Sequence, residues 1–441
     1  MVAYGLVSRT VARVTKYQRR IVDDELDALI AGLPALSIDG AKGVGKTATA
    51  MERAATAFAL DSPETLALIE ADPQRLTTAP EPTLIDEWQR YPASWDLVRR
   101  AVDARGEPGR FLLTGSASPQ TPGTHSGAGR IVRVRMRPLT LPERGLEAPT
   151  VSLAALLAGT PSGARVEISG STQVNLQTYA EHIVAGGFPG MNASTGRAQR
   201  ARLSSYTDLI VDRDFPEAGL AVRNPALLRR WMAAYAAATA TTASYESLRD
   251  AASAGAGNKP AKSTTIPYQD TLQRIWVSDP LAAWSPSHNH LKRLTLAPKH
   301  HLADPALAVS LTGLTLDDLM TGRGPGVAIP RDGTFLGALF ESLVALNLRV
   351  FAQGAEAHVY HLRTKSGERE IDFMITGPDG KVVAVEVKLA QVVSTGDVRH
   401  LKWLADALGP NLLDAVVVTT GTEAYRRADG IAVVPLALLG P

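Results

Sequence analysis

A glycine-rich stretch near the N-terminus constrains the fold more than any other feature. Residues 40–47 read GAKGVGKT and match the pattern G-x-x-x-x-G-K-[ST] at every fixed position. The apolar run 33–38 before it predicts a buried strand, and residues 48–60 after it are typical of a helix. In this order, a glycine turn lets backbone N–H groups surround a phosphate at the start of a helix. We therefore predict a phosphate-binding loop; the alternative is a chance glycine-rich turn.

The loop also predicts the contacts to a nucleoside triphosphate. Lys46 is placed to reach the β- and γ-phosphates, and the Thr47 hydroxyl is placed to hold Mg²⁺. We therefore expect ATP and Mg²⁺ as cofactors. The residues expected to contact ATP are Gly40, Ala41, Lys42, Gly43, Val44, Gly45, Lys46, Thr47 and Ala48.

Two further apolar runs end in polar residues suited to hydrolysis. Residues 82–85 precede Asp86 and Glu87, which follow Lys46 by about forty residues. We expect Asp86 to hold Mg²⁺ through water and Glu87 to orient and deprotonate the attacking water. A third strand at 110–113 leads to Ser116, a candidate sensor of the γ-phosphate. A turn or helix N-cap is the alternative reading of Ser116.

Arginines are prominent in residues 130–137. From Val132 onward, apolar residues alternate with Arg133, Arg135 and Arg137, which predicts a strand with one basic face. That face is either solvated or in contact with phosphate. Arg130 is our candidate for an arginine finger acting on the γ-phosphate in catalysis. A second basic stretch, either a solvated entry helix or a nucleic-acid contact, contains Arg9, Arg13, Lys16, Arg19 and Arg20.

Composition excludes several classes of protein. The 441 residues are too many for one core, and a formal charge of +2 is too small to imply nucleic acid by itself. Cysteine is absent, which excludes disulfides, thiolate zinc sites and cysteine nucleophiles. We find no apolar run near the ~20 residues of a membrane span and no secretory signal at the N-terminus. A cytoplasmic protein without membrane contact is expected.

The middle of the chain is predicted to be helical. Residues 150–225, interrupted at Gly186-Gly187-Phe188-Pro189, are typical of a lid or connector. Helices expected at 227–240, 245–252 and 265–277, with a wing at 290–299, indicate a winged helix. Lys259, Lys262, Ser263 and Thr264 are candidate phosphate contacts. A winged-helix scaffold used only for packing is the alternative.

The C-terminal residues predict a small α/β domain that carries an acidic site. A helix is expected at 336–350 and strands at 357–362, 370–375 and 382–388. Asp372, Glu386 and Lys388 form the pattern D-x₁₃-E-x-K on neighbouring strands. The two acids would bind Mg²⁺ and the lysine would steer a water, with Glu341 and Glu370 as further ligands. A further helix at 397–408 and strands at 415–420 and 431–435 complete the domain.

A resemblance to a known family rests on a series of short segments. They are GAKGVGKT, Leu60-Asp61-Ser62-Pro63, Ala71-Asp72-Pro73, DEWQRYP, FLLTGSASP, Gly129-Arg130, Gly186-Gly187-Phe188-Pro189, Asp212-Arg213-Asp214-Phe215 and the C-terminal acids. In this order the chain resembles predicted prokaryotic AAA-type ATPases with a C-terminal domain of unknown function. The resemblance implies that this last domain is similar to PD-(D/E)xK nucleases, which often keep the fold without cleavage. The usual member has Pro-Arg-Gln where this chain has Ala41-Lys42-Gly43.

We therefore expect an α/β protein of four units. They are a P-loop AAA-type ATPase domain with a parallel sheet (1–148), a helical lid or connector (149–223), a winged-helix-like domain (224–325) and a nuclease-like α/β domain (326–441). The first functional hypothesis is ATP hydrolysis coupled to the handling of DNA, with metal-dependent cleavage at the C-terminal site. The second is a nucleotide-driven switch that binds DNA or a protein partner without cutting. Arg130 acting in trans would require a homo-oligomer.

Overall fold

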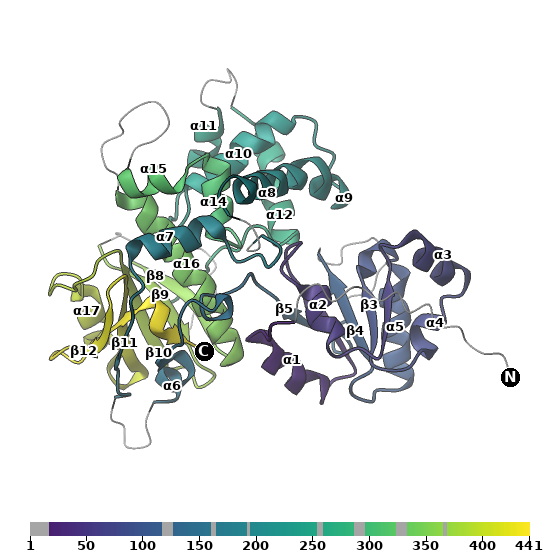
Figure 1. The fold of residues 1–441 in the computed structure, drawn as a ribbon, viewed down its shortest axis with the longest axis horizontal. Helices are drawn as coiled ribbons and strands as arrows, with labels where there is room; N and C mark the ends of the chain where they lie inside the picture. The colour runs from purple at the N-terminus through teal and green to yellow at the C-terminus, as the bar shows by residue number, and fades with distance from the viewer. Residues whose placement is uncertain are drawn as a thin grey trace.

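The structure is a computed structural model (Figure 1), which describes residues 17–116, 127–159, 165–191, 195–253, 259–285, 296–322, 333–364 and 368–441. Several sequence-based expectations lie outside the described residues. These are the basic residues Arg9, Arg13 and Lys16 and most of the expected wing at 290–299. A five-stranded sheet lies at one end of the molecule and a seven-stranded sheet at the other, with a group of helices beside them.

The N-terminal sheet has five parallel strands in the order β2-β3-β4-β1-β5. Its strands are β1 (Ala35–Asp39), β2 (Thr56–Ala59), β3 (Thr83–Asp86), β4 (Phe111–Gly115) and β5 (Val132–Arg135). Its helices are α1 (Val22–Ile30), α2 (Lys46–Met51), α3 (Pro63–Ala71), α4 (Arg75–Thr78), η1 (Trp88–Arg90) and α5 (Ala93–Ala104). All residues of β1, β3 and β4 are buried. Because the strands are parallel, the carboxyl ends of β1 and β3 lie at the same edge of the sheet, on either side of β4.

The helix expected at 48–60 is wrong in its second half. The helix α2 ends at Met51, and residues 56–59 form β2, which pairs with β3 at the sheet edge. Alanine-rich residues favour a helix by local propensity, but pairing with a neighbouring strand outweighs that preference. Half-buried residues such as Phe58 alternate with exposed ones in β2, as expected of an edge strand.

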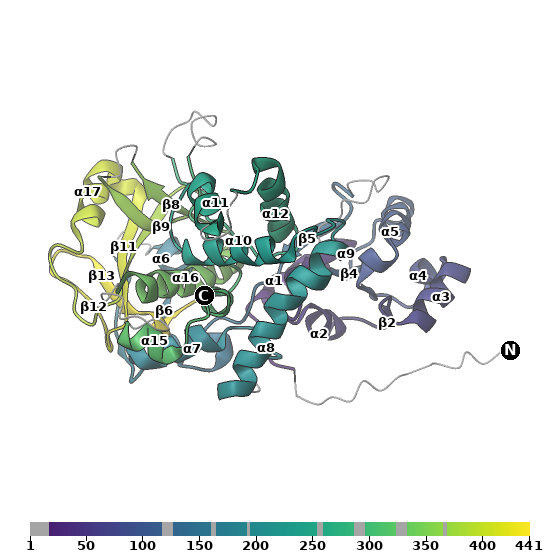
Figure 2. The same cartoon turned by 90° about the horizontal axis from the view of Figure 1, so that it is seen from above.

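The middle of the chain is a helical bundle. Its helices are α7 (Leu176–Ala185), α8 (Gly196–Leu209), the π-helix η3 (Ile210–Asp214), α9 (Phe215–Glu217), α10 (Pro225–Ala237), α11 (Tyr245–Ser253), α12 (Lys262–Arg274), α14 (Pro305–Thr312) and α15 (Leu316–Thr321). The three helices expected for a winged helix thus form as α10, α11 and α12. Buried Trp231 stacks on Tyr235 and meets Tyr268 edge-on, which fixes α10 against α12. Helix α8 runs toward the N-terminal sheet (Figure 2).

The C-terminal sheet has seven strands in the order β7-β12-β13-β11-β10-β9-β8. Its strands are β7 (Gly170–Ser171), β8 (His358–Arg363), β9 (Glu370–Thr376), β10 (Val382–Lys388), β11 (Leu412–Thr419), β12 (Glu423–Arg426) and β13 (Ala432–Pro435). Strands β8, β9 and β10 are antiparallel, and β10, β11 and β13 run parallel. Helices α16 (Gly333–Gly354), α17 (Arg399–Leu408) and α6 (Leu153–Ala158) contact this sheet.

Two short strands correct the expectation that residues 149–175 belong to a helical connector. β7 pairs with β12 at the edge of the C-terminal sheet, and β6 (Val151–Ser152) pairs with β14 (Leu439–Gly440). These pairings are far apart in sequence, so local pattern gave no sign of them. Residues 150–159 and 165–171 therefore belong structurally with the C-terminal unit.

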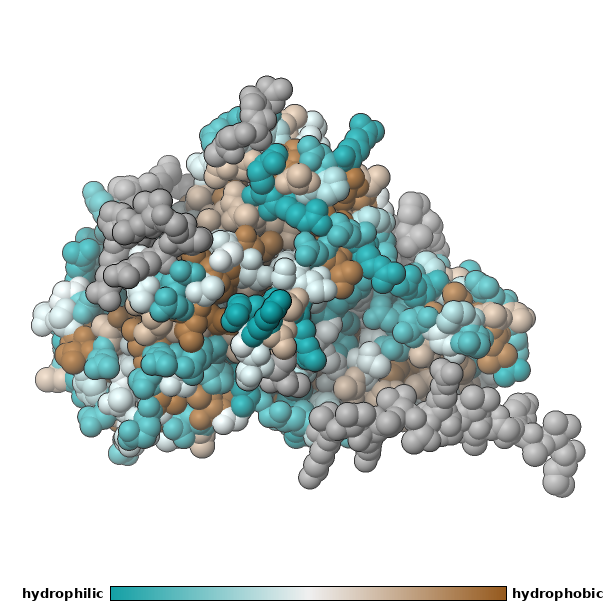
Figure 3. All heavy atoms as spheres, turned by 45° about the horizontal axis from the view of Figure 1, so that its top comes forward, coloured by the Kyte–Doolittle hydropathy of each residue, from teal (hydrophilic) through white to brown (hydrophobic). Residues whose placement is uncertain are grey.

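Helix α16 corrects the expectation that no apolar run is long enough to cross a membrane. Phe335–Gly354 is long and apolar enough by composition, but 72% of its most apolar window is buried inside the protein. It contacts α1, α7, α14, β8, β9 and β10, so it acts as a central core helix. Hydrophilic residues predominate on the face shown in Figure 3. Among the described residues, the exposed large hydrophobic side chains are scattered. Met51, Leu68, Leu209, Ile266 and Tyr425 lie on different elements, and Val392 lies between β10 and α17.

Candidate functional site

The phosphate loop joins the carboxyl end of β1 to the first residue of α2. Gly43 and Gly45 have φ of 79° and 103°, a left-handed region that a side chain rarely adopts. Lys46 is 5% exposed, and its Nζ donates to the carbonyl oxygens of Gly40 and Ala41, both at 2.9 Å. Burial lowers the pKa of Lys46 to about 8. The ammonium group thus lies inside the loop that is predicted to hold the phosphates.

Thr47 and Asp86 meet at the edge of the sheet. Thr47 Oγ1 donates to Asp86 Oδ1 at 2.8 Å, and Thr114 on β4 donates to the same oxygen. The strand order explains this meeting, because β4 lies between β1 and β3 and its residue at this edge reaches the carboxylate. A hydroxyl and a carboxylate side by side are hard oxygen donors of the kind that Mg²⁺ prefers. The residues present therefore fit the predicted metal position.

Glu87 is held above this edge in an unusual backbone conformation. Its φ of 53° and ψ of 47° are left-handed, which costs free energy in a residue other than glycine. The side-chain amide of Gln89 donates to the Glu87 carboxylate and, at 3.2 Å, to Ser116 Oγ. Burial raises the pKa of Glu87 despite the nearby Lys46 ammonium. Glu87 and Ser116 are therefore joined through Gln89.

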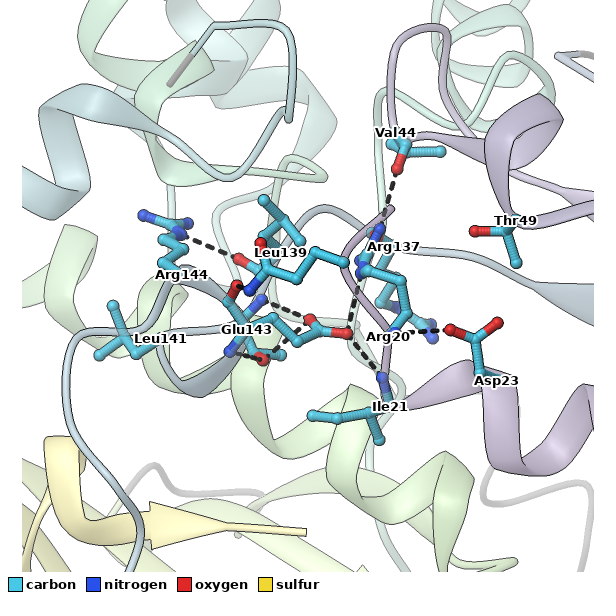
Figure 4. Close-up of polar contacts among 12 residues, drawn as sticks. Arg20, Ile21, Asp23, Val44, Thr49, Arg137, Leu139, Leu141, Glu143 and Arg144 are labelled. Atoms are coloured by element: carbon cyan, nitrogen blue, oxygen red, sulfur yellow. Dashed lines mark hydrogen bonds and ion pairs between the residues drawn. The ribbon is translucent and has the colours of Figure 1, made fainter. Parts of the chain in front are cut away.

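Arg20 fixes the loop from the other side (Figure 4). Its NH1 donates to the carbonyl of Val44 at 3.0 Å, and its NH2 donates to the carbonyl of Arg137 at 2.9 Å. Its Nε forms an ion pair with Glu143 at 2.9 Å, and both side chains are at most 5% exposed. The basic N-terminal stretch was expected to be either a solvated helix or a nucleic-acid contact. Neither applies to Arg20, because its guanidinium group is buried. It supports the phosphate loop instead.

The helical unit touches the same loop directly. Lys42 Nζ donates to Asp214 Oδ1 at 2.6 Å and to Glu217 Oε2 at 2.8 Å. The Tyr206 hydroxyl donates to the carbonyl of Lys42 at 3.1 Å. Tyr206, Asp214 and Glu217 belong to residues 196–217, which form α8, η3 and α9. From here on, the connector means residues 196–217, which are only part of the helical lid or connector expected at 149–223. Burial acts to lower the pKa of Lys42, but the two carboxylates outweigh it and raise that pKa.

Arg130 lies away from the loop of its own chain. It precedes β5, whose Val132 pairs with Leu36 near the start of β1, so Arg130 is at the amino end of the sheet. Its Nε pairs with Asp103 at 2.8 Å, and the side chain is 48% exposed. Arg130 therefore does not reach the phosphate loop of its own chain. Action on a neighbouring chain stays a prediction.

The three other strand arginines follow the predicted alternation. Arg133 pairs with Asp39, and the guanidinium of Arg135 lies 3.9 Å from the ring centre of Trp276. Arg137 Nε pairs with Asp279 at 2.9 Å. Arg135 and Arg137 therefore contact the segment after α12 through an aromatic ring and ion pairs, whereas the side chain of Arg133 is 40% exposed.

At the C-terminal site, the predicted acids converge on a lysine that the sequence analysis did not single out. Lys299 Nζ lies 2.8 Å from Glu341 Oε1, 2.8 Å from Glu370 Oε1 and 3.0 Å from Asp372 Oδ1. We call Glu341, Glu370, Asp372 and Glu386 the acid cluster. Burial acts to lower the pKa of Lys299, but the surrounding carboxylates outweigh it and raise that pKa.

Glu386 and Lys388 lie on one face of β10, as predicted. Lys388 Nζ is 3.3 Å from Glu386 Oε2, while Glu386 Oε1 is buried without a hydrogen-bond partner. The second oxygen of Asp372 accepts from the backbone N–H of Val387 at 2.9 Å. Among the described residues, no group of His, Cys, Asp and Glu side chains is arranged to hold a metal ion. The residues therefore do not fit the predicted metal site.

Comparison with protein families divides the chain into three matches. Residues 33–144 match the family described as an AAA domain. The N-terminal unit is an AAA-type P-loop ATPase domain. Residues 176–318 and 336–439 match two families described as domains of unknown function, DUF8612 and DUF4143. The ATPase domain makes the chain an ATP-binding and ATP-hydrolysing protein, with a DUF4143 domain at its C-terminal end.

Relatives among known proteins are themselves uncharacterized. Mb2031c of Mycobacterium bovis and Rv2008c of Mycobacterium tuberculosis are each 24% identical over 353 residues, a match that covers 80% of this chain and 67% of each relative. Among solved structures, the Walker-type ATPase PABY2304 of Pyrococcus abyssi has a TM-score of 0.39 at 13% identity and covers 68% of this chain and 98% of its own. The ORC2 protein of Aeropyrum pernix has a TM-score of 0.29 at 14% identity, covering 69% and 95%.

Three residues of the two sites escaped the sequence analysis. Thr114 binds Asp86, the predicted metal ligand, Gln89 binds Glu87, the predicted base, and Lys299 lies among the acids of the acid cluster. Thr114 lies in the segment FLLTGSASP and Gln89 lies in DEWQRYP, both of which the sequence analysis singled out. The polar residue at the end of β4 could therefore have indicated the contact between Thr114 and Asp86. Lys299 lies 42 residues before Glu341 in the chain. No local pattern connects it to the acids.

Proposed function

We propose that this chain is a nucleotide-driven switch, in which ATP binding and hydrolysis change the contact between the phosphate loop and the connector. The observation that carries the proposal is the Lys42 ammonium group, which belongs to the loop and binds Asp214 and Glu217 of the connector. Phosphate oxygens at the loop would compete with these carboxylates for the same cation. Loss of the γ-phosphate on hydrolysis would weaken that competition.

The apolar contacts of the loop support the same coupling. A Cβ atom on Gly43 would lie 3.9 Å from Phe188 Cδ1, and one on Gly45 would lie 3.8 Å from Pro189 Cγ. Phe188 in turn lies against Tyr206 of the connector, with ring centres 5.0 Å apart. A change in the geometry of the phosphate loop would therefore shift Phe188, Pro189 and the connector together, because closely packed groups transmit small shifts.

For hydrolysis, we propose that Glu87 orients the attacking water and accepts its proton, while Gln89 holds the carboxylate and Ser116 in place. Thr47 would hold Mg²⁺ directly, and Asp86 would hold it through water. When bound, that ion would neutralise charge on the phosphate groups. Lys46 would leave the carbonyl oxygens of Gly40 and Ala41 for the phosphates. The rise in the pKa of Glu87 on burial favours its role as a base.

The connector contact can be tested by hydrogen exchange. In the parent chain we expect amides of residues 196–217 to exchange faster with a non-hydrolysable ATP analogue than with ADP. The double variant Asp214→Asn/Glu217→Gln should bind both nucleotides but lose this difference. Asp208→Asn is the matched control, because Asp208 lies on α8 and pairs with Arg229 rather than with the loop. Equal exchange in the two nucleotide states of the parent would refute the switch.

The partner of the switch belongs to the proposal as well. We propose a cytoplasmic protein whose helical and C-terminal units bind DNA or a protein without cutting, because the acid cluster already holds Lys299. Of the candidate phosphate contacts, Lys259 pairs with Asp250 at 2.5 Å and also with Glu246, so it is engaged within the bundle. ATPase rates measured with and without single- and double-stranded DNA test the partner. Stimulation by DNA identifies nucleic acid, and an unchanged rate favours protein.

A further inference from the structure

We propose that the Lys299 ammonium group is the resident cation of the acid cluster and that it excludes divalent metal ions. The cluster then fastens the segment around Lys299 to the C-terminal sheet and does not serve as a nuclease centre. This inference is independent of the nucleotide switch, and it concerns what the DUF4143 domain can bind. It begins with the disagreement between the metal site predicted for Asp372 and Glu386 and the lysine found there.

The first argument is the position of the cation. Three carboxylate oxygens lie within 3.0 Å of Lys299 Nζ, from Glu341, Glu370 and Asp372. The ammonium group donates hydrogen bonds to Glu341 and Asp372 and forms an ion pair with Glu370. The Lys299 side chain is 2% exposed, so water does not compete for those donors. A divalent ion needs the same oxygens at ~2.0 to 2.6 Å and cannot share that position with an ammonium group.

The second argument is the rigidity of the segment that carries the lysine. The backbone N–H of Lys299 donates to the carbonyl of Leu281, and the N–H of Leu281 donates to the carbonyl of Lys299, both at 2.9 Å. The neighbouring residue Ala283 forms a bridge to His361 on β8, and His361 Nε2 contacts the carbonyl of Ala297 at 3.0 Å. The backbone therefore holds Lys299 over the sheet, and the ammonium group is preorganised for the acids.

The third argument is the balance of charge. Without Lys299, the carboxylates of Glu341, Glu370 and Asp372 would be left close together, and Glu341 and Asp372 are largely buried. Lys388 already pairs with Glu386, and it is not within ion-pair distance of the other three acids. Among the described residues, the Arg363 guanidinium lies 3.9 Å from Glu370 Oε2, and the His400 imidazole has its Nδ1 4.0 Å from Glu386 Oε1. Removing the ammonium group therefore leaves a site that demands another cation.

The test is thermal unfolding of the full chain without nucleotide, with EDTA or with millimolar Mg²⁺ or Mn²⁺. We expect the Tm of the parent to be the same in all three conditions. Lys299→Met should unfold at a lower temperature in EDTA and regain at least about 2 °C with Mn²⁺, because a divalent ion now replaces the ammonium group. Lys388→Met is the matched control, since it removes a lysine beside the cluster but leaves Lys299 in place; it should gain nothing from Mn²⁺.

A second variant and the parent itself keep the test decisive if Lys299→Met does not fold. Lys299→Met/Asp372→Asn has one carboxylate fewer, so it should be more stable than the single variant in EDTA and respond less to Mn²⁺. The inference is overturned if Mn²⁺ raises the Tm of the parent and Asp372→Asn abolishes that rise. It is also overturned if the parent cleaves DNA with Mg²⁺, or if Lys299→Met is as stable as the parent and indifferent to Mn²⁺.

Discussion

At the scale of single residues, the ATPase domain separates nucleotide binding from the activation of water. Lys46 lies within the loop and binds its carbonyl oxygens, whereas Glu87 lies beyond the end of β3 and binds Gln89. The left-handed backbone of Glu87 turns the chain sharply after Asp86, so two adjacent acids need not share one position. This geometry suits Asp86 for the metal and Glu87 for the water.

The separation leads to a prediction for two variants. Lys46→Ala should greatly weaken ATP binding, because it removes the cation inside the loop. Glu87→Gln should keep ATP affinity within a few-fold and lower turnover by about 10²- to 10⁴-fold, the usual contribution of a general base. Binding of a fluorescent ATP analogue and single-turnover hydrolysis measure the two effects. An equal loss of affinity in both variants would contradict the assignment.

The residues predicted correctly from sequence are those that local chain geometry brings together. The loop residues 40–47 are contiguous, and Asp86 reaches Thr47 because both follow strands of one parallel sheet. Lys299 could not be predicted, since its contact with Asp372 depends on how two separate units pack. The position of Arg130 could not be predicted, because the pattern of a strand does not show at which end of the sheet the residue before it lies.

At the scale of elements, α1 and η2 (Pro142–Arg144) support the phosphate loop from outside the sheet. Glu143 accepts from Arg20 Nε, from the backbone N–H of Ile21 and from the N–H of Thr140, at 2.8 to 2.9 Å. These contacts tie the start of α1 to the residues that follow β5. Through Arg20 they also reach Val44 in the loop.

A matched pair of arginines tests this support. Arg20→Met should destabilise the chain by about 3 kcal/mol and weaken ATP binding, because it leaves the Glu143 carboxylate buried without its cation. Arg19→Met should change neither quantity measurably. Arg19 is the next residue, but its side chain is 62% exposed and its partners Asp24 and Asp27 are exposed as well. Urea unfolding and ATP titration provide the measurements; similar effects of the two substitutions would argue against a loop support.

The sequence predicted helices and strands correctly where the segment itself shows the hydrophobic periodicity of that element. Strands β8, β9, β10, β11 and β13 and helices α10, α11 and α12 lie close to their expected positions. Strands β2, β6 and β7 were missed, because each is at most four residues long and pairs with a strand far along the chain. The four-residue strand β12 was missed although it also pairs with the next strand, β13. Short edge strands lack the alternation over several residues that distinguishes a strand from a loop.

At the scale of the whole molecule, the Gly186–Pro189 loop joins the ATPase domain to the helical bundle. The backbone N–H of Gly187 donates to Asp304 Oδ2 at 2.6 Å, and its carbonyl accepts from Leu139 N at 2.7 Å. Asp304 also lies 3.7 Å from the buried guanidinium of Arg144. Phe188 and Pro189 follow directly and approach the phosphate loop. The same short segment thus contacts α14, the residues after β5 and the nucleotide site.

Two glycines that flank Phe188 and Pro189 give the final prediction. A Cβ atom on Gly187 would lie 2.5 Å from the carbonyl oxygen of Leu139 and 2.7 Å from Arg144 NH2, too close for any side chain. Gly187→Ala should therefore force backbone movement, cost about 1–3 kcal/mol of stability, and weaken ATP binding because Phe188 and Pro189 move with it. A Cβ atom on Gly190 would meet nothing within 4 Å, so Gly190→Ala should leave ATP affinity unchanged and stability the same or slightly higher. Urea unfolding and ATP titration of both variants separate the effect of the close contacts at Gly187 from the effect of a substitution at nearby Gly190. If Gly187→Ala lowered stability without changing ATP affinity, this loop would hold the units together but would not carry a signal between them.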